Sequence, residues 1–341
     1  MGCSLKAAWR RQSVKHLARS SIAICLIAAV CTTAATVSGS AAAEDFPHRT
    51  IKIVVPVPPG PLLDVIPRIV AEKLSAKWGV AVIIENRPGA AQNLGAEAVA
   101  RSDPDGYTLL ASPPGPLVVS GHLRSKLNFD PDAFVPVSLM VRLPTVLVIN
   151  PKVPASNLQE LLAYAKANPG KLTFGSPGTG STPHLATEQL MKAADIRLVH
   201  VPYQGMAPAM NDLIGGHIDM MIDLYGNVAG NIKEGKLRLL AVTTPARLQQ
   251  EPAVPSISEA VPGSIHEEWF AIVAPPKTPD AIAAKLSAAI REVLALPDVA
   301  GRLADLAAVP VGSNPDESAA FIKAESARWR ELIDTTGLKI N

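Results

Sequence analysis

One stretch of the chain, Leu172-Thr-Phe-Gly-Ser-Pro-Gly-Thr-Gly-Ser-Thr-Pro-His-Leu-Ala-Thr-Glu-Gln-Leu-Met-Lys-Ala-Ala-Asp-Ile-Arg-Leu-Val-His-Val-Pro202, shows how it folds. Its two ends, residues 172–175 and 198–202, are short apolar runs typical of buried strands. Residues 184–194 predict a helix between them. Because parallel strands need a connection long enough to hold a helix, the stretch predicts two parallel strands joined by a helix.

The same alternation continues on both sides of this stretch. Further strand candidates are residues 51–56, 80–85, 107–111, 218–222 and 237–243. Helix candidates are residues 64–78, 91–101, 158–168 and 208–215, and a Ser156-x-x-Gln159 capping box precedes the third of them. This alternation predicts an α/β fold with parallel-rich sheets.

The pattern changes after Trp269, where helices follow one another. Residues 280–295, 298–308 and 316–335 each open on an acidic residue, which suits the N-terminus of a helix. Two extended stretches, residues 135–151 and 267–275, are far apart in the chain and could cross between domains. The first contains two extended apolar runs that are split by Arg142-Leu-Pro144. We therefore expect a hinge of crossing strands between two lobes. Lobe 1 would hold residues 44–143 plus 269–341, and lobe 2 residues 144–268.

Residues 1–43 have the order of a secretory signal peptide. A basic leader with Arg10 and Arg11 precedes an apolar run at 22–30, and Ala41-Ala42-Ala43 precedes Glu44. We expect cleavage near Glu44 and a periplasmic mature protein. A retained membrane anchor is disfavoured because the apolar run is about half of the ~20 residues that a spanning helix needs. Lipidation of Cys31 is disfavoured because Val30 precedes it, and the choice between general and twin-arginine export stays open.

Composition excludes several classes of function. All three cysteines lie within residues 1–43, so the mature chain would have no disulfide, thiol nucleophile or zinc–cysteine site. The leader holds five Lys and Arg and no acidic residue, so the formal charge changes from +2 to −3 without it. No basic field then remains for nucleic acid. No cofactor fingerprint or metal-ligand spacing is present, so we expect neither group.

Two loops that join a strand to a helix are the candidates for binding. Residues 175–184 are rich in Gly and hydroxyl side chains, and their N–H groups could form a cradle for an anion at the helix N-terminus. The alternative is a glycine-rich turn that only reverses the chain. In the second loop, residues 56–64, the prolines offer no N–H donors, and Asp64 reads most simply as a helix N-cap.

These loops, with motifs along the whole mature chain, resemble the substrate receptors of the tripartite tricarboxylate transporters, the Bug-type periplasmic solute-binding proteins. The motifs are Phe46-Pro47 with the 51–56 strand, Pro58-Pro59-Gly60 to Asp64, Glu85-Asn-Arg-Pro-Gly-Ala90, Pro104-Asp-Gly-Tyr-Thr-Leu109, Val148-Ile-Asn-Pro151, Asn168-Pro-Gly-Lys171, Phe174-Gly-Ser176 through Gly180 with His184-Leu185, His200-Val-Pro-Tyr203, and Ala274-Pro275. The resemblance implies a two-lobed periplasmic-binding-protein fold, or Venus flytrap. It also implies a carboxylate ligand trapped between backbone-rich loops, and membrane permease subunits as partners.

The resemblance further implies which residues bind. Its first-lobe contacts fall on the 58–64 loop and after the 107–111 strand, at Pro59, Gly60, Leu62, Asp64, Ser112 and Gly115. Its second-lobe contacts fall on the glycine-rich loop and the cleft wall, at Ser176, Gly178, Thr179, Gly180, Ser181, His184, Tyr203 and Asp223.

The chain departs from the family pattern inside these loops. Gly60-Pro-Leu-Leu-Asp64 stands where the family usually has a second glycine and a hydroxyl, and Tyr203-Gln-Gly-Met206 replaces a lysine and a glycine. A pocket poor in cations disfavours a tricarboxylate. We expect a mono- or dicarboxylate with one carboxylate on the Gly178 loop and an apolar or aromatic body against Leu62, Leu63, Met206 and Tyr203. The alternative is that these side chains point into the cores of the lobes.

Single side chains allow more than one interpretation. His184 could contact the ligand, or pack or cap at the start of its helix, whereas His200 in an apolar strand reads as a core residue with a hydrogen-bond partner. Asp219 is expected to bond a turn, and Asp223 to face a crevice at the carboxyl end of its strand. Trp269 could lie in the core or in the cleft.

The leading hypothesis is a monomeric receptor that hands a small organic carboxylate to a membrane transporter. A receptor that reports the ligand to a membrane sensor would leave the same sequence signals. An exported hydrolase or lyase would need an activated pair such as Ser181 with His184 or Asp64 with Asp223. Neither pair lies in a catalytic motif, so we expect no enzymatic activity.

Overall fold

The computed structural model describes residues 46–60, 62–124 and 126–336. The predicted signal peptide, its cleavage site and Cys31 lie outside these ranges. The elements below belong to one compact unit, Pro47–Asn341. None of the helices in the described ranges is both long enough and apolar enough to cross a membrane.

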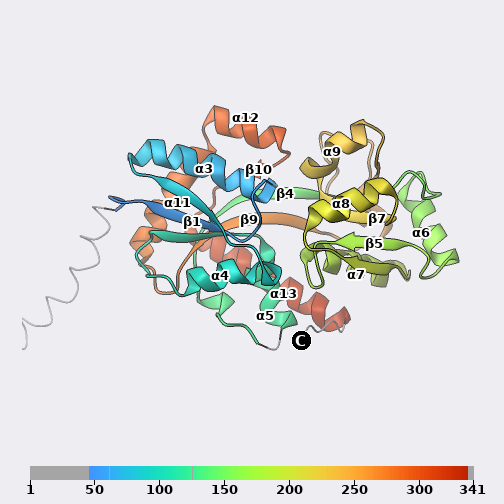
Figure 1. The fold of residues 1–341 in the computed structure, drawn as a ribbon, viewed down its shortest axis with the longest axis horizontal. Helices are drawn as coiled ribbons and strands as arrows, with labels where there is room; N and C mark the ends of the chain where they lie inside the picture. Colours follow the sequence, from blue (N-terminus) through green and yellow to red (C-terminus); the bar gives the residue numbers. More distant parts are fainter. Residues whose placement is uncertain (1–45, 61, 125, 337–341) are drawn as a thin grey trace, which may run out of the picture. The chain divides into compact units, whose positions relative to one another are not determined.

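The first sheet begins with three parallel strands in the order β2-β1-β3 (Figure 1). They are β1 (Ile51–Val55), β2 (Val82–Asn86) and β3 (Thr108–Ser112), and Ile53 pairs with both Ile84 and Leu109. Strand β9 (Glu267–Ala274) lies antiparallel to β3. The strands at 51–56, 80–85 and 107–111 are therefore confirmed within two residues.

Strand β4 (Val135–Ile149) passes from the first sheet into the second. It pairs antiparallel with β9 as far as Pro144, which lies opposite Glu267. From Thr145 onward its partners are β7 and β8. The two expected crossing stretches are thus neighbours in one continuous sheet, and together they connect two lobes. The residue boundaries of the lobes given above stay a prediction.

The second sheet repeats the parallel arrangement. Strand β5 (Thr173–Ser176) lies between β6 (Val199–Pro202) and β7 (Met220–Leu224), and both pairings are parallel. Strand β8 (Arg238–Val242) pairs antiparallel with β4. The stretch quoted at the start therefore folds as predicted, with α7 (Thr182–Ala194) between β5 and β6.

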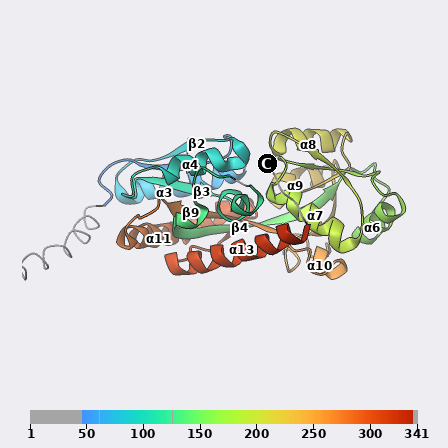
Figure 2. The ribbon, with the colours of Figure 1, turned by 90° about the horizontal axis from the view of Figure 1, so that it is seen from below.

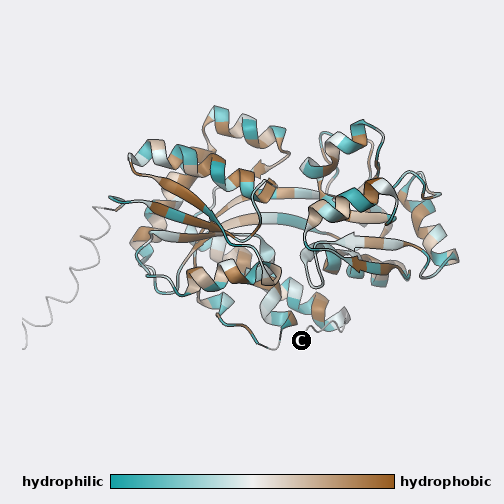
Figure 3. Cartoon of the chain, in the orientation of Figure 1, coloured by the Kyte–Doolittle hydropathy of each residue, from teal (hydrophilic) through white to brown (hydrophobic). Residues whose placement is uncertain are grey.

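Helices cover both faces of each sheet. In the first lobe, α3 (Leu62–Trp78) lies on one side and α4 (Asn93–Ala100) on the other (Figure 1). In the second lobe both faces of β4 are buried, and its side chains alternate between them. Leu147 and Ile149 pack with α6 (Leu158–Ala167) and α7 on one face. Val146 and Val148 pack with α8 (Met206–Gly215) and α9 (Tyr225–Lys233) on the other. Figure 3 shows the helices with mixed hydrophilic and hydrophobic positions, as expected when one face is buried.

The C-terminal helices return to the first lobe. They are α11 (Asp280–Leu294), α12 (Pro297–Asp305) and α13 (Pro315–Thr336), and the short strand β10 (Val309–Pro310) pairs with β4. Helix α13 also reaches the second lobe, because Trp329, Leu332 and Ile333 share a core cluster with Leu185 of α7 (Figure 2). The remaining short helices are α5 (Ser120–Leu123), α10 (Ile257–Ala260), η1 (Ala90–Gln92), η2 (Gly115–Val119) and η3 (Pro131–Ala133).

Two local predictions were wrong. Helix α6 is capped by Asn157, whose side chain accepts a hydrogen bond from the Glu160 N–H, so the predicted Ser156–Gln159 box is displaced by one residue. Ser156 instead donates to the Glu160 carboxylate. In addition, residues 135–149 form one strand although Pro144 was expected to split them. Proline is tolerated here because the strand changes partners at this position, where one ladder bond is not required.

Candidate ligand-binding site

A cavity of about 410 Å³ lies where the two lobes meet. Its walls come from the carboxyl ends of the parallel strands, since residues directly after β1, β2, β3, β5, β6 and β7 line it. The lining residues are Pro56, Val57, Pro58, Leu62, Leu63, 88–92, Pro113, Gly115, Ser120, Leu123, Arg124, Thr145, 177–183, 204–206, Asp223, Leu224, Asn227 and Glu268. Ligands of open α/β sheets bind at this end of the strands.

The glycine-rich loop lines the cavity, but its hydrogen bonds are largely internal. The Gly178 N–H donates to Ser176 Oγ, and the Gly180 N–H donates to His184 Nδ1. The Ser181 hydroxyl donates to the Gly178 carbonyl at 2.7 Å. Both glycines have positive φ, 136° and 81°. In this conformation the two glycine N–H groups are engaged within the loop, so the glycines supply backbone geometry and not the free donors that were predicted.

His184 holds this loop from the side away from the cavity. It is 3% exposed, stays outside the cavity lining, and accepts the Gly180 N–H. Its ring stacks on His200 with the centroids 4.0 Å apart, and on Phe174 at 6.0 Å. The packing interpretation of His184 therefore describes the structure.

His200 and Ser176 extend the contacts that hold the glycine-rich loop. His200 Nε2 lies 2.6 Å from Ser176 Oγ, so this histidine has the hydrogen-bond partner that was expected. Burial and the neighbouring His184 lower the pKa of His200 to about 4, which keeps the ring neutral at physiological pH. Ser176 is fully buried and does not reach the cavity.

Asp64 holds the other predicted loop, residues 56–64, through hydrogen bonds outside the cavity lining. It lies in the first turn of α3, so it is not the N-cap residue that was predicted, and it accepts hydrogen bonds from the Gly60 N–H, Arg68 and Asn86. Burial disfavours its charge, but these hydrogen bonds outweigh that effect and lower its pKa. Pro59, Gly60 and Asp64 are absent from the cavity lining, where Val57 and Pro58 stand in their place.

The apolar substitutions do reach the cavity. Leu62 and Leu63 line it from the first lobe, and Gln204 and Met206 line it from the second. The alternative in which these side chains are only core residues therefore does not describe the structure. Near β3 the lining residues are Pro113 and Gly115, whereas Ser112 is buried and donates to the Pro113 carbonyl.

Three other side chains lie away from the cavity. The Tyr203 hydroxyl donates to Asp212, and burial with this carboxylate raises the pKa of Tyr203 to about 12. Trp269 is a core residue whose indole N–H donates to Glu325. Asp219 accepts hydrogen bonds from the Thr173 N–H and hydroxyl, so it links β7 to the neighbouring strand.

Sequence reasoning missed several lining residues. Arg124 follows α5 and is the cation in the described lining, and Glu268 is a buried acid on β9. Glu268 had a signal, because a carboxylate inside an apolar strand needs a special environment. Arg124, Thr182 and Asn227 had none, because their place in the cavity depends on how the two lobes meet.

Asp223 and Glu268 together form what we call the acidic floor of the cavity. Asp223 Oδ1 accepts from the Leu224 N–H at 2.7 Å and from Asn227 Nδ2 at 3.0 Å. Glu268 Oε1 accepts from the Thr182 hydroxyl and lies 3.5 Å from His266 Nε2. Burial raises the pKa of Asp223 to about 7, and the Glu268 charge adds to this rise. Asp223 thus faces the crevice as predicted, but with an acidic neighbour.

A left-handed turn forms another part of the wall. Gly89, Ala90, Ala91 and Gln92 have φ values of 125°, 48°, 50° and 75°. Consecutive non-glycine residues in this region are strained, at a cost of roughly 1–2 kcal/mol each. The turn contacts the neighbouring wall, because a Cβ on Gly115 would lie 2.9 Å from Gln92 Oε1.

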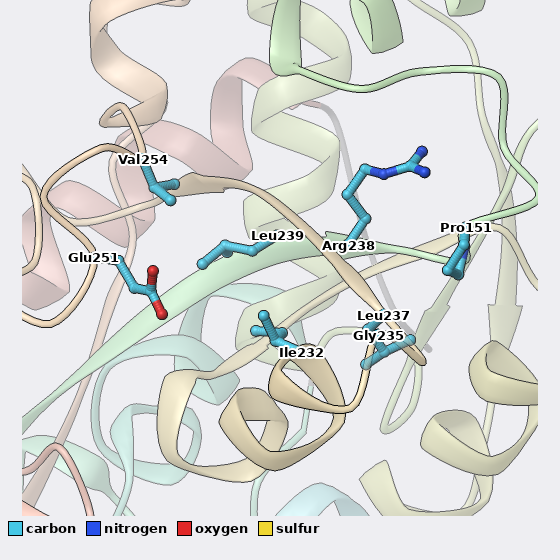
Figure 4. Close-up of a pocket in the computed structure, with 8 residues that line it drawn as sticks. All are labelled: Pro151, Ile232, Gly235, Leu237, Arg238, Leu239, Glu251 and Val254. Atoms are coloured by element: carbon cyan, nitrogen blue, oxygen red, sulfur yellow. The ribbon is translucent and has the colours of Figure 1, made fainter.

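A second cavity, of about 430 Å³, lies on the outer side of β8 (Figure 4). Its two charged side chains have partners elsewhere, since Arg238 donates to the Ala155 carbonyl and Glu251 accepts from the Tyr225 hydroxyl. None of the predicted site residues lines it. In the parts of the chain that the structure describes, no group of three or more His, Cys, Asp or Glu side chains could hold a metal ion.

Comparison with known proteins points to one family. The family model described as "Tripartite tricarboxylate transporter family receptor" matches residues 66–338. Protein BugT of Bordetella pertussis is 37% identical over 90% of this chain and 95% of its own length. The structure of R. palustris Rpa4515 with adipate superposes with a TM-score of 0.82 at 32% identity, covering 86% of this chain and 99% of that one. MatC (Rpa3494) from Rhodopseudomonas palustris with bound malate gives 0.76 at 31% identity, covering 84% and 100%. The chain therefore belongs to the receptor family of the tripartite tricarboxylate transporters.

Proposed function

We propose that this protein is a periplasmic receptor that captures a small organic carboxylate between its lobes and delivers it to the membrane permease subunits of a tripartite tricarboxylate-type transporter. The observation that carries the proposal is the cavity at the carboxyl ends of both sets of parallel strands. Two solved structures of similar fold contain adipate and malate, respectively. The predicted leader supports the periplasmic location.

The lining favours a mono- or dicarboxylate with an apolar or aromatic body. Leu62, Leu63 and Met206 offer apolar surface to the body, and Arg124 is the described cation that could face a carboxylate. One cation cannot compensate three carboxylates removed from water, so a tricarboxylate is disfavoured. Thr179, which lines the cavity between Gly178 and Gly180, would complete the carboxylate site.

The predicted site residues then divide into two roles. Leu62, Gly115, 178–181 and Asp223 line the cavity and would contact the ligand. Pro59, Gly60, Asp64, Ser112, Ser176, His184 and Tyr203 lie outside the lining and would position the loops that do. No cofactor is needed for either role.

A purely binding role fits the hydrogen bonds of the two candidate catalytic pairs. The Ser181 hydroxyl donates to the Gly178 carbonyl, and His184 Nδ1 already accepts the Gly180 N–H. Asp64 is held by Arg68 and Asn86 below its loop, away from Asp223. Neither pair forms the nucleophile–base contact that hydrolysis requires.

The test is a thermal-shift screen of carboxylates, followed by calorimetry. A ligand at 100 times its dissociation constant stabilises the folded state by about 2.7 kcal/mol, which raises the melting temperature by several degrees. Arg124→Gln should weaken binding of the best carboxylate about tenfold, whereas Arg101→Gln, on the surface at the end of α4, should not. The receptor proposal fails if no carboxylate of the screen stabilises the protein, and the preference for a mono- or dicarboxylate fails if citrate alone does so.

A further inference from the structure

We propose that the acidic floor, Asp223 with Glu268, is a subsite for a positively charged ammonium group of the ligand. The ligand would then be an amino-carboxylate, with its carboxylate toward Arg124 and the glycine-rich loop and its ammonium on the floor. This inference rests on the proposed function, because it names the chemical class of the captured solute.

The first argument is that each floor residue has an oxygen without a partner. Asp223 and Glu268 are 3% and 6% exposed, and both line the cavity. In the described structure Asp223 Oδ2 and Glu268 Oε2 are buried and accept no hydrogen bond. A buried carboxylate oxygen without a donor is costly, and native proteins rarely leave one. These two oxygens therefore need a donor, and the cavity is where one can enter.

The second argument is that the protein does not supply this donor itself. Leu224 and Asn227 donate to the other oxygen of Asp223, and Thr182 donates to the other oxygen of Glu268. His266 Nε2 lies 3.5 Å from that same Oε1, within ion-pair range but beyond hydrogen-bond length, and neither ring nitrogen of His266 has a hydrogen-bond partner among the described residues. No lysine lines the cavity in the described ranges. Because both floor residues line the cavity, a ligand there is a further source of a donor.

The third argument concerns charge. Two neighbouring buried carboxylates cannot both ionise without a shared proton or a cation. Burial is the main cause of the raised pKa of Asp223, and the charge of Glu268 adds to the rise. An ammonium group would let both groups ionise and would donate a charged hydrogen bond to each of them. A second ligand carboxylate at the same place would instead meet two acids.

The experiment compares ligand pairs of nearly equal length that differ at one end. The pairs are adipate with ε-aminohexanoate, succinate with γ-aminobutyrate, and terephthalate with p-(aminomethyl)benzoate. Calorimetry on the full mature chain should show the amino member of the best-binding pair binding about tenfold or more tightly than its dicarboxylate partner.

Variants then assign this preference to the floor. Glu268→Gln keeps the shape of the side chain and an acceptor for Thr182, and should lower affinity for the amino ligand about tenfold while affecting the dicarboxylate less. Glu267→Gln is the matched control, because it removes the same charge from the adjacent position of β9, outside the cavity lining. Asp223→Asn provides a second floor variant if Glu268→Gln does not fold.

The outcomes separate the two proposals. If dicarboxylates bind more tightly than their amino partners, the ammonium subsite is wrong and the carboxylate receptor stands. If the amino ligand is preferred but Glu268→Gln and Asp223→Asn leave that preference unchanged, the floor is not its cause and the subsite is also wrong. If none of the six ligands, nor any other carboxylate of the screen, binds, both proposals fail.

Discussion

The glycine-rich loop and the acidic floor line the same cavity, but they differ in how complete they are without a ligand. In the loop, Ser176, His184 and Ser181 engage the polar groups of Gly178 and Gly180. On the floor, Asp223 and Glu268 each keep a buried oxygen without a donor. The sequence motifs indicated the loop as the binding site, but the carboxylate oxygens without hydrogen-bond partners lie on the floor.

This difference indicates that the loop and the floor have separate roles in binding. A loop whose hydrogen bonds are complete holds its shape before the ligand arrives, so it lowers the cost of ordering the site. A floor with open acceptors gains hydrogen bonds when the ligand arrives, so it can discriminate between solutes. Four substitutions test whether the loop and the floor differ in this way.

The largest effect is expected for Asp223→Asn, measured as the free energy of unfolding against pH. The pKa of Asp223 is about 7 in the folded protein, against its ordinary value of 3.8. Between these values the folded state binds more protons than the unfolded state, so this residue makes stability fall as pH rises from about 4 to 7. The fall is at most about 4 kcal/mol, and Asp223→Asn should lack it.

Other titratable groups meet the floor, so the wild-type curve alone does not isolate Asp223. Glu268 and His266 face it from β9 and the residue before it, and the neutral Asn227 faces it from α9. His200, with its pKa lowered to about 4, destabilises the protein as pH falls, in the opposite direction. Urea titrations at several pH values should therefore compare the two proteins point by point. If the free energies of unfolding of the two proteins depend on pH in the same way, the pKa of Asp223 is not raised in the folded state.

Gly178→Val tests whether the loop is a preorganised scaffold. At φ 136° a β-branched residue is strained by about 1–3 kcal/mol, although a Cβ would meet the Tyr203 carbonyl only at 3.7 Å. We expect a lower melting temperature and about tenfold or greater loss of affinity for the best carboxylate. Gly170→Val is the matched control, because Gly170 also has positive φ, with open space around its Cβ position. Equal loss of affinity in both variants would contradict a specific role for the loop.

Ser181→Ala removes one of the internal hydrogen bonds of the loop. A neutral hydrogen bond contributes about 1 kcal/mol net, so stability should fall by that amount and affinity by less than the valine variant loses. Chemical denaturation and calorimetry on the same preparation would show both changes. If affinity fell as strongly as in Gly178→Val, the hydroxyl would be a direct ligand group and the loop would not be complete on its own.

The smallest effect is expected for Ala91→Gly in the left-handed turn of the opposite wall. Glycine adopts φ 50° without strain, which should stabilise the protein by about 0.5–1 kcal/mol after the larger entropy of the unfolded chain is subtracted. Ala98→Gly within α4 is the control, and it should destabilise the protein. A destabilised Ala91→Gly protein would show that the methyl group is required at this wall.

The fold was predictable because its signals are local and repeated. Apolar runs such as 51–56 and 198–202, separated by stretches that suit helices, fix strands and connections whatever the distant parts of the chain do. The capping residue of α6 was missed because Ser156 and Asn157 are both good caps and the choice depends on one residue of register. The continuity of β4 through Pro144 was missed because it depends on partners from distant segments.

The site was only partly predictable, because the sequence locates loops but not which of their residues reach the cavity. Motifs placed Gly178, Thr179, Leu62 and Asp223 correctly at its lining, but they could not show that Tyr203 turns toward Asp212. Glu268 comes close to Asp223 because β4 pairs with both β9 and β7, a proximity that the sequence alone does not show.

The path of β4 and β9 also constrains the order of folding. The first sheet is complete only when β9 inserts between β3 and β4, yet the whole of β5 to β8 separates β4 from β9 in the chain. Contacts of such long sequence separation form slowly, since a large loop must close before they are gained. A chain truncated before Glu267 would leave β3 and the first half of β4 without their shared partner. We therefore expect the first lobe to be completed last, although residues 44–143 emerge first from the ribosome.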